Sequence, residues 1–222
     1  MPPGTSPPSS PVCRLLYIRA DRPFEIGPHL DVFAEISRNS VEYQGHGWGC
    51  AWNNDGAWAF HHDIEPIWEG DRSGFGKTTL LLAHARSAFR DEGIRVENNM
   101  PFFDGRYVFI FNGELQGVRI REEGRIGAEK IFNYLKRFDK GSLIDAIERG
   151  VEVIEKRTRY VRAMNFVMAS LENAFVVSSY SENPDYFQLH RRTNDHLDLI
   201  CSSAYPGENG WRAIDNHTIQ AI

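Results

Sequence analysis

The sequence has few cysteines and lacks a long apolar run. Its 222 residues contain three cysteines, Cys13, Cys50 and Cys201, which form no Cys-x-x-Cys pair and are too few for a disulfide framework. No segment approaches the roughly 20 apolar residues of a membrane span, and the first residues lack the basic and apolar regions of a secretory signal. A disulfide-stapled secreted domain and a membrane protein are thereby excluded, and we expect a cytoplasmic protein in a reducing compartment.

An excess of positive charge is also lacking. The chain carries 25 Lys and Arg against 30 Asp and Glu, a formal net charge of −5, and its pI is near 5.9. General binding to nucleic acids or to anionic membranes needs a basic surface. We therefore expect neither nucleic acid nor membrane among its partners.

Patterns typical of metal and phosphate sites are missing as well. The run His61-His62-Asp63 places adjacent side chains on opposite faces of a strand, without a second pair at metal-ligand spacing. Residues 70–78 end in Gly-Lys-Thr, but five residues instead of four separate Gly70 from Gly76. We interpret both as turn or loop segments and expect no metal and no other cofactor.

What the chain does contain is enough apolar material for one large domain. Hydrophobic residues make up 41% of it, ample for a sizeable core. Residues 1–12 are mostly Pro and Ser and cannot fold alone, because proline withholds a hydrogen-bond donor. The sequence predicts a disordered leader or propeptide over residues 1–12 and one domain over residues 13–222.

Hydrophobic periodicity predicts strands, then helices, then strands again. A hairpin is expected over residues 49–60, around the turn Asn53-Asn54-Asp55-Gly56. Helices are expected over 128–138 and 142–159, the second with Ser142 as its N-cap. The remaining predicted strands cover residues 14–19, 80–85, 107–111, 165–170, 174–180, 186–191, 197–202 and 217–222. Runs of strands around a helical block indicate an α+β fold.

Cys13 follows the leader directly and is the strongest candidate for a nucleophile. Many cysteines are only small buried apolar residues, and Cys13 could be one of them. A cysteine at a mature N-terminus, however, carries its own α-amino group within reach of its thiol, so one residue supplies both nucleophile and base. We expect the active form to begin at Cys13, because the leader is cleaved or because the true start lies just before it.

Four downstream segments strengthen this interpretation. They are Gly-His-Gly-Trp-Gly at 45–49, Ala-His-Ala-Arg-Ser-Ala at 83–88, Asn-Asn-Met-Pro-Phe at 98–102 and Phe-Asn-Gly-Glu-Leu at 111–115. Together with Cys-Arg-Leu-Leu at 13–16, their order resembles the glutaminase domain of class II glutamine amidotransferases, a branch of the N-terminal-nucleophile hydrolases. The likeness is greatest to the small stand-alone members and spans nearly all of residues 13–222.

The resemblance implies a fold and a set of roles. The fold is two antiparallel sheets packed face to face, sandwiched between helical layers. Cys13 would attack a side-chain carboxamide, and Asn112 and Gly113 would hold the oxyanion, although Asn-Gly is also the commonest turn dipeptide. Arg86 would clamp the substrate α-carboxylate, with a structural ion pair as its alternative. Ser87 and Trp48 would also bind substrate, although Trp48 equally suits a core.

Several positions depart from the family pattern, among them His46 where an Asp is common, and they concern the substrate rather than catalysis. Phe89 stands where the family usually has Thr or Ser, and Met100 and Phe111 stand where it commonly has His. Gly127 aligns with the acidic residue that grips the substrate α-amino group. Loss of that charge-assisted contact costs about 1.5–3 kcal/mol, so the substrate is expected to be glutamine or a related γ-glutamyl-type amide, including amides without a free amino group.

The expected function is ammonia release from such an amide through a Cys13 thioester. The alternative is a catalytically weak or inactive subunit that works with a separate synthase or peptidase partner, because a lone glutaminase domain has no acceptor site of its own. A non-enzymatic scaffold that keeps its leader is the third possibility. The partners implied are therefore a small-molecule amide and, for the alternative, an ammonia-accepting or complex-forming protein.

Overall fold

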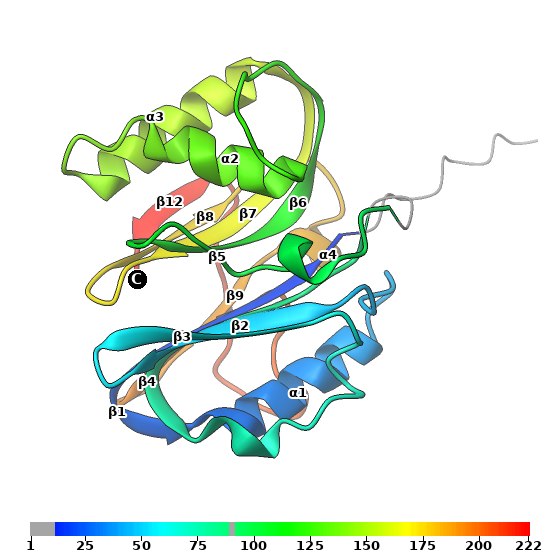
Figure 1. Ribbon diagram of the computed structural model, residues 1–222, viewed down its shortest axis with the longest axis vertical. Helices are drawn as coiled ribbons and strands as arrows, with labels where there is room; N and C mark the ends of the chain where they lie inside the picture. Colours follow the sequence, from blue (N-terminus) through cyan, green and yellow to red (C-terminus); the bar gives the residue numbers. More distant parts are fainter. Residues whose placement is uncertain (1–11, 89–91) are drawn as a thin grey trace, which may run out of the picture.

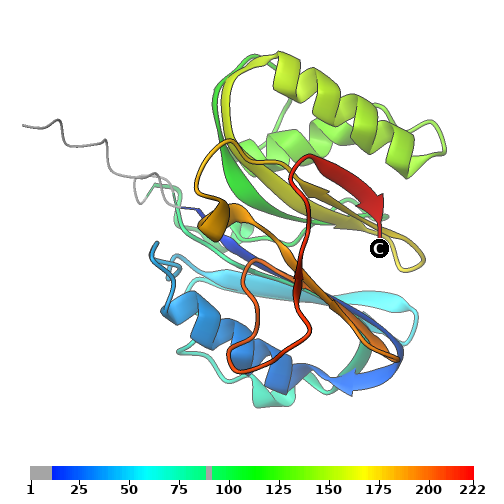
Figure 2. The same cartoon turned by 180° about the vertical axis from the view of Figure 1, so that it is seen from behind.

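The computed structural model describes residues 12–88 and 92–222. Two antiparallel sheets pack face to face, and helices cover the outer face of each sheet (Figures 1 and 2). This arrangement confirms the α+β sandwich expected from the sequence. The predicted leader, apart from Val12, and Phe89 lie outside the described residues.

The first sheet has seven strands and the second has five. In spatial order the first contains β11 (Arg212–Ala213), β9 (His190–Thr193), β10 (Leu197–Cys201), β1 (Arg14–Glu25), β4 (Lys77–Ala85), β2 (Trp48–Asn54) and β3 (Ala57–Asp63). The second contains β12 (Thr218–Ala221), β8 (Ala174–Ser178), β7 (Thr158–Ala169), β6 (Val108–Val118) and β5 (Phe102–Phe103). The long central strands β1 and β6 therefore lie in different sheets.

Strand β1 shows how the sequence fixes the layers. Alternate residues of a strand point to opposite faces, and β1 is apolar on both. Leu15 and Tyr17 join the cluster that fills the space between the sheets, whereas Leu16 and Ile18 pack under helix α1 (Ile26–Arg38). A strand that is covered on both sides needs this unbroken apolar run.

Helices α2 (Gly127–Lys136) and α3 (Leu143–Lys156) cover the outer face of the second sheet (Figure 1). The predicted cap is confirmed, since the Ser142 side chain accepts a hydrogen bond from the Asp145 N–H. Short helical segments are α4 (Pro184–Phe187), η1 (Ser73–Phe75) and η3 (Val96–Asn98). Every helix in residues 12–88 and 92–222 is too short or too polar to cross a membrane.

The predicted hairpin is confirmed, and several other boundaries are corrected. Strands β2 and β3 pair around Asp55 and Gly56, which both have positive φ, as a two-residue hairpin turn requires. Helix α1 was not expected from the sequence, and its first turn contains Gly27 and Pro28. Strand β7 starts at Thr158, where the helix was expected to continue, and residues 186–191 split between α4 and β9.

Phe109 on β6 anchors the core beneath the helical layer. Its ring is fully buried, and its centre lies 5.0 Å from the centre of the Phe132 ring on α2 and 5.3 Å from that of the Phe166 ring on β7. We expect Phe109→Ala to lower the free energy of unfolding by about 3–5 kcal/mol, because the change loses apolar burial and leaves a cavity.

Urea unfolding measures this effect, with Phe103→Ala as the matched control. Phe103 is 42% exposed, so its truncation creates no enclosed cavity and should cost little stability. Equal losses for the two variants would show that Phe109 does not hold the helices to the sheet.

Candidate active site

Cys13 and Arg86 lie at adjoining strand ends in the first sheet. Strand β1 pairs with β4 in a register that sets Arg14 opposite Ala85, so the residues just beyond this pair are neighbours. The Cys13 Sγ atom accepts a hydrogen bond from the Ser87 N–H at 3.4 Å and lies 3.6 Å from the Ser87 carbonyl oxygen. The structure thus brings three predicted site residues together.

The surroundings of Cys13 leave its thiol protonated at rest. Burial raises the pKa of the Cys13 thiol, while the Ser87 N–H and the Arg86 guanidinium act in the opposite direction. Only a thiolate is a strong nucleophile. A thiol whose pKa is raised needs a base at the moment of attack, which makes a neighbouring amine valuable.

Arg86 is a buried cation held by neutral oxygens. It is 5% exposed, and its Nη1 atom donates to the Gly93 carbonyl at 2.9 Å and to the Asn99 Oδ1 at 3.4 Å. Its Nη2 atom donates to the Glu92 carbonyl at 3.5 Å. Within the described residues no carboxylate forms an ion pair with this guanidinium. A buried charge gains most from an anionic partner, so this arrangement suits a carboxylate ligand and disfavours the structural ion pair considered above.

Asn112 lies on β6 in the second sheet and is fully buried. Neither polar atom of its side-chain amide has a hydrogen-bond partner within the described residues. Gly113 follows, and a Cβ at this position would overlap the Ala163 carbonyl oxygen on β7. The main chain therefore makes a close approach here that only glycine allows.

Two features link the second sheet to the end of the first sheet where Cys13 lies. Val12 belongs to the same buried cluster as Ala163, the residue whose carbonyl also lies close to Gly113. The His84 Nε2 atom on β4 lies 3.1 Å from the Phe111 carbonyl oxygen on β6. Thus the neighbours of Cys13 and those of Asn112 meet at one end of the interface between the sheets.

The junction before Cys13 is held by two side chains that the sequence analysis does not identify. The Val12 carbonyl accepts a hydrogen bond from Gln44 Nε2 at 2.7 Å and another from the Tyr186 hydroxyl at 2.8 Å. Val12 itself is 1% exposed. The start of β1 is therefore anchored on its N-terminal side.

Ser87 and Trp48 occupy different positions relative to the site. The main chain of Ser87 contacts Cys13, and its buried hydroxyl has no partner within the described residues. Trp48 packs against His61 and Phe75 in the cluster under α1. This is the opposite face of the sheet from Leu15, which agrees with the core position that Trp48 also suits, and its substrate-binding role stays a prediction.

The segment aligned with the acidic residue begins helix α2. A Cβ at Gly127 would meet no atom within 4 Å, so the position has room for a side chain. The nearby carboxylate, Glu129, accepts hydrogen bonds from the Arg125 main-chain N–H at 2.5 Å and from its guanidinium Nε at 3.0 Å. Glu129 is thus already neutralised and does not replace the missing acid.

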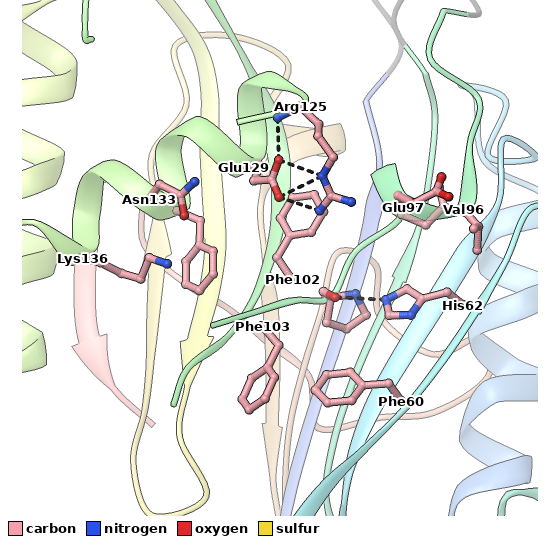
Figure 3. A pocket seen from close by; sticks show the side chains of 13 residues that line it. Phe60, His62, Val96, Glu97, Phe102, Phe103, Arg125, Glu129, Asn133 and Lys136 are labelled. Atoms are coloured by element: carbon pink, nitrogen blue, oxygen red, sulfur yellow. Dashed lines mark hydrogen bonds and ion pairs between the residues drawn. The ribbon is translucent and has the colours of Figure 1, made fainter. Parts of the chain in front are cut away.

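A pocket of about 350 Å³ opens beside the site, between β3, the 96–103 segment and α2 (Figure 3). Cys13, Arg86 and Asn112 do not line it. Asn99 lines it, and the Asn99 Oδ1 atom also lies 3.4 Å from Arg86 Nη1, so the pocket adjoins Arg86.

His84 is a further buried polar residue that the sequence analysis leaves without a role. Burial lowers the pKa of His84 to about 3, so its ring is neutral, and its Nδ1 atom has no partner within the described residues. Its place in the motif with Arg86 was visible in the sequence. Gln44 and Tyr186 gave no comparable signal, because only the fold brings them to Val12.

No protein-family model and no curated protein sequence matches the chain. Among solved structures, the chain is similar to a glutamine aminotransferase class-II domain protein from Silicibacter pomeroyi, with 14% identity, a TM-score of 0.66 and coverage of 95% of this chain and 94% of that one. It is also similar to a predicted glutamine amidotransferase from Pseudomonas aeruginosa, with 16% identity, a TM-score of 0.59 and coverage of 94% and 96%.

A third similar structure is the glutamine phosphoribosylpyrophosphate amidotransferase of B. subtilis. The identity is 16% and the TM-score 0.60, and the match covers 86% of this chain but 42% of that larger one. The sheets, the helical layers and these likenesses agree: the chain has the fold of class II glutamine amidotransferase domains.

Proposed function

We propose that the protein is an amidohydrolase that releases ammonia from a γ-glutamyl-type carboxamide through a thioester on Cys13. The observation that carries this proposal is the unpaired, fully buried amide of Asn112 at the same end of the sheet interface as the Cys13 thiol. An unsatisfied buried amide costs about 1–3 kcal/mol. A donor held in place for a developing oxyanion accounts for that cost.

The proposed reaction uses groups of the chain itself. The Cys13 α-amino group accepts the thiol proton while the sulfur attacks the carboxamide carbon. The Asn112 amide and the Gly113 N–H stabilise the oxyanion. The carbon–nitrogen bond then breaks, the proton passes to the leaving nitrogen, and ammonia departs from a thioester. Water hydrolyses the thioester to a carboxylate and restores the thiol, so no cofactor is required.

The proposed base exists only when Cys13 is the first residue. A peptide nitrogen is not basic, whereas a free α-amino group has a pKa of about 7.7–8.0. Cleavage of the peptide bond between Val12 and Cys13 would also free the side chains of Gln44 and Tyr186, which donate hydrogen bonds to the Val12 carbonyl. We therefore propose that the active species begins at Cys13.

Arg86 is proposed to bind the α-carboxylate of the substrate, because its guanidinium is buried without a carboxylate partner in the described structure. The α-amino group has no corresponding acid, since Gly127 has no side chain and Glu129 is paired with Arg125. We expect Gly127→Asp to raise kcat/KM for glutamine by roughly 10- to 100-fold, the range that one charge-assisted contact provides.

Ammonia release from glutamine and from N-acetylglutamine tests both the activity and this contact. Gly74→Asp is the matched control, because Gly74 also has nothing within 4 Å of its Cβ position and the change adds the same charge. Equal gains for both amides would place Gly127 away from the ammonium. No ammonia from any carboxamide, with the chain starting at Cys13, would overturn the proposed activity.

A second candidate is a subunit that acts with a separate ammonia-accepting or complex-forming protein. The observation that favours it is the exposed apolar surface beside Gln44, where Val41 is 90% and Tyr43 59% exposed. Exposed apolar residues in a group commonly mark contact surfaces. Full turnover by the purified protein alone would count against this candidate.

A further inference from the structure

The pocket beside the site has an aromatic wall that nothing in the proposed reaction uses. The rings of Phe60 on β3 and Phe103 on β5 lie 5.1 Å apart at a tilt of 42°, and Figure 3 shows them side by side at one end of the pocket. Phe103 is 42% exposed. Two adjoining phenyl rings, one of them open to solvent, form a surface suited to another flat apolar group.

Cations lie over the other two phenyl rings of the pocket. The Arg125 guanidinium lies 5.5 Å from the centre of the Phe102 ring, and the Lys136 ammonium lies 4.2 Å from that of Phe132. The faces of these rings are therefore partly occupied. The phenyl rings that a ligand can contact without displacing a cation are those of Phe60 and Phe103.

The charges around the pocket are largely paired with one another. Arg125 forms a salt bridge with Glu129, and Lys136 forms one with Asp104 at 3.2 Å. The hydrogen bonds to Glu129 raise the pKa of the Arg125 guanidinium, and the exposed Glu97 carboxylate adds to this effect. A ligand that enters this pocket thus meets compensated charge, which neither attracts a free ammonium strongly nor repels a neutral group.

Asn99 connects Arg86 with the pocket. Its Oδ1 atom lies 3.4 Å from Arg86 Nη1, and its Nδ2 atom donates to the Asp63 carbonyl at 2.7 Å. An α-carboxylate bound at Arg86 would therefore lie near Asn99, which also lines the pocket. The substituent on the α-nitrogen of such a substrate is the part with room to extend there.

We propose that this pocket binds an aromatic acyl group on the α-nitrogen of the substrate, so that the preferred amide is an N-aroyl or N-arylacyl glutamine. The inference rests on the proposed function, because it places the carboxylate at Arg86 and the carboxamide at Cys13. It also explains why no acid stands at Gly127: an acylated nitrogen is neutral and needs no anionic partner.

Ammonia release from glutamine, N-acetylglutamine and N-phenylacetylglutamine tests the proposal, with the chain starting at Cys13. We expect kcat/KM to be highest for the phenylacetyl compound. Phe103→Ala should lower kcat/KM for that amide by about tenfold, as the loss of one aromatic contact does, and should leave N-acetylglutamine unchanged. Phe175→Ala, a half-buried phenylalanine of β8 that does not line the pocket, is the matched control.

Binding of N-phenylacetylglutamate by calorimetry separates this proposal from the activity, because binding of the reaction product needs no turnover. Weaker binding to Phe103→Ala than to the Phe175→Ala control supports the pocket even where no amide is hydrolysed. Equal kcat/KM for the three amides, or binding that Phe103→Ala does not weaken, overturns the pocket assignment and leaves the proposed hydrolysis intact.

Discussion

Cys13→Ala is expected to abolish ammonia release and to leave the fold intact. The methyl group of alanine cannot attack a carboxamide, so the thioester cannot form. Within residues 12–88 and 92–222 the hydrogen bonds of the thiol are those to the Ser87 main chain, at 3.4 and 3.6 Å, and sulfur is a weak hydrogen-bond partner. An ammonia assay measures the first effect, and circular dichroism during thermal unfolding measures the second.

Cys201→Ala provides the matched control for this experiment. Cys201 is fully buried in the cluster under α1, and burial raises the pKa of its thiol to about 11. We expect its removal to affect stability and to leave turnover per folded molecule unchanged. Residual turnover by Cys13→Ala above that of boiled protein would contradict the nucleophile assignment.

The role of the α-amine can be separated from that of the thiol in the same assay. Protein that begins at Cys13 should be at least as active as the full chain, because only the former has a basic nitrogen beside its sulfur. Intact mass identifies which form is present. Full activity from protein that retains residues 1–12 would remove the amine from the mechanism while leaving the thiol in place.

The sequence indicated several residues that the structure brings together, because they lie in or directly after buried strands within recognisable segments. Arg86 and Ser87 directly follow a buried strand, and Asn112 and Gly113 lie within another. Antiparallel pairing of β1 with β4 places Arg86 and Ser87 next to Cys13. The position of Asn112 and Gly113 depends on which sheet contains β6, and that expectation came from the family resemblance.

Features that depend on the packing of distant segments were beyond the sequence. The face on which Trp48 points follows from the register of β2 with β4, which a short aromatic-rich run does not fix. The Val12 carbonyl meets Gln44 and Tyr186 only through the fold. The aromatic pocket likewise combines Phe60 with Phe103, and neither residue belongs to a pattern that indicates a ligand.

Asn112→Ala is expected to reduce kcat by roughly 10²–10³ while KM changes little, as for the loss of one oxyanion donor. The oxyanion exists only in the transition state and the intermediate, so the amide contributes little to substrate binding. Steady-state kinetics with the best amide substrate measures the split. A change confined to KM would assign Asn112 to substrate binding instead.

The same substitution should also leave stability unchanged or raise it, which an ordinary buried asparagine would not do. The Asn112 amide has no hydrogen-bond partner within the described residues, so its removal eliminates the free-energy cost of burying an unsatisfied polar group. Asn165 is its cross-strand partner on β7 and gives the contrast: its Nδ2 atom donates to the Phe187 carbonyl at 2.7 Å, and its Oδ1 atom accepts from the Ser179 N–H at 3.0 Å.

Asn165→Ala should therefore lower the free energy of unfolding by about 1–3 kcal/mol, since it leaves two buried main-chain groups unpaired, and should affect kcat much less than Asn112→Ala. Opposite effects of the two substitutions on stability and activity would identify Asn165 as a structural residue and Asn112 as a hydrogen-bond donor to the oxyanion. If Asn112→Ala instead destabilises the fold as Asn165→Ala does, the Asn112 amide is a structural group, and the oxyanion assignment loses its main support.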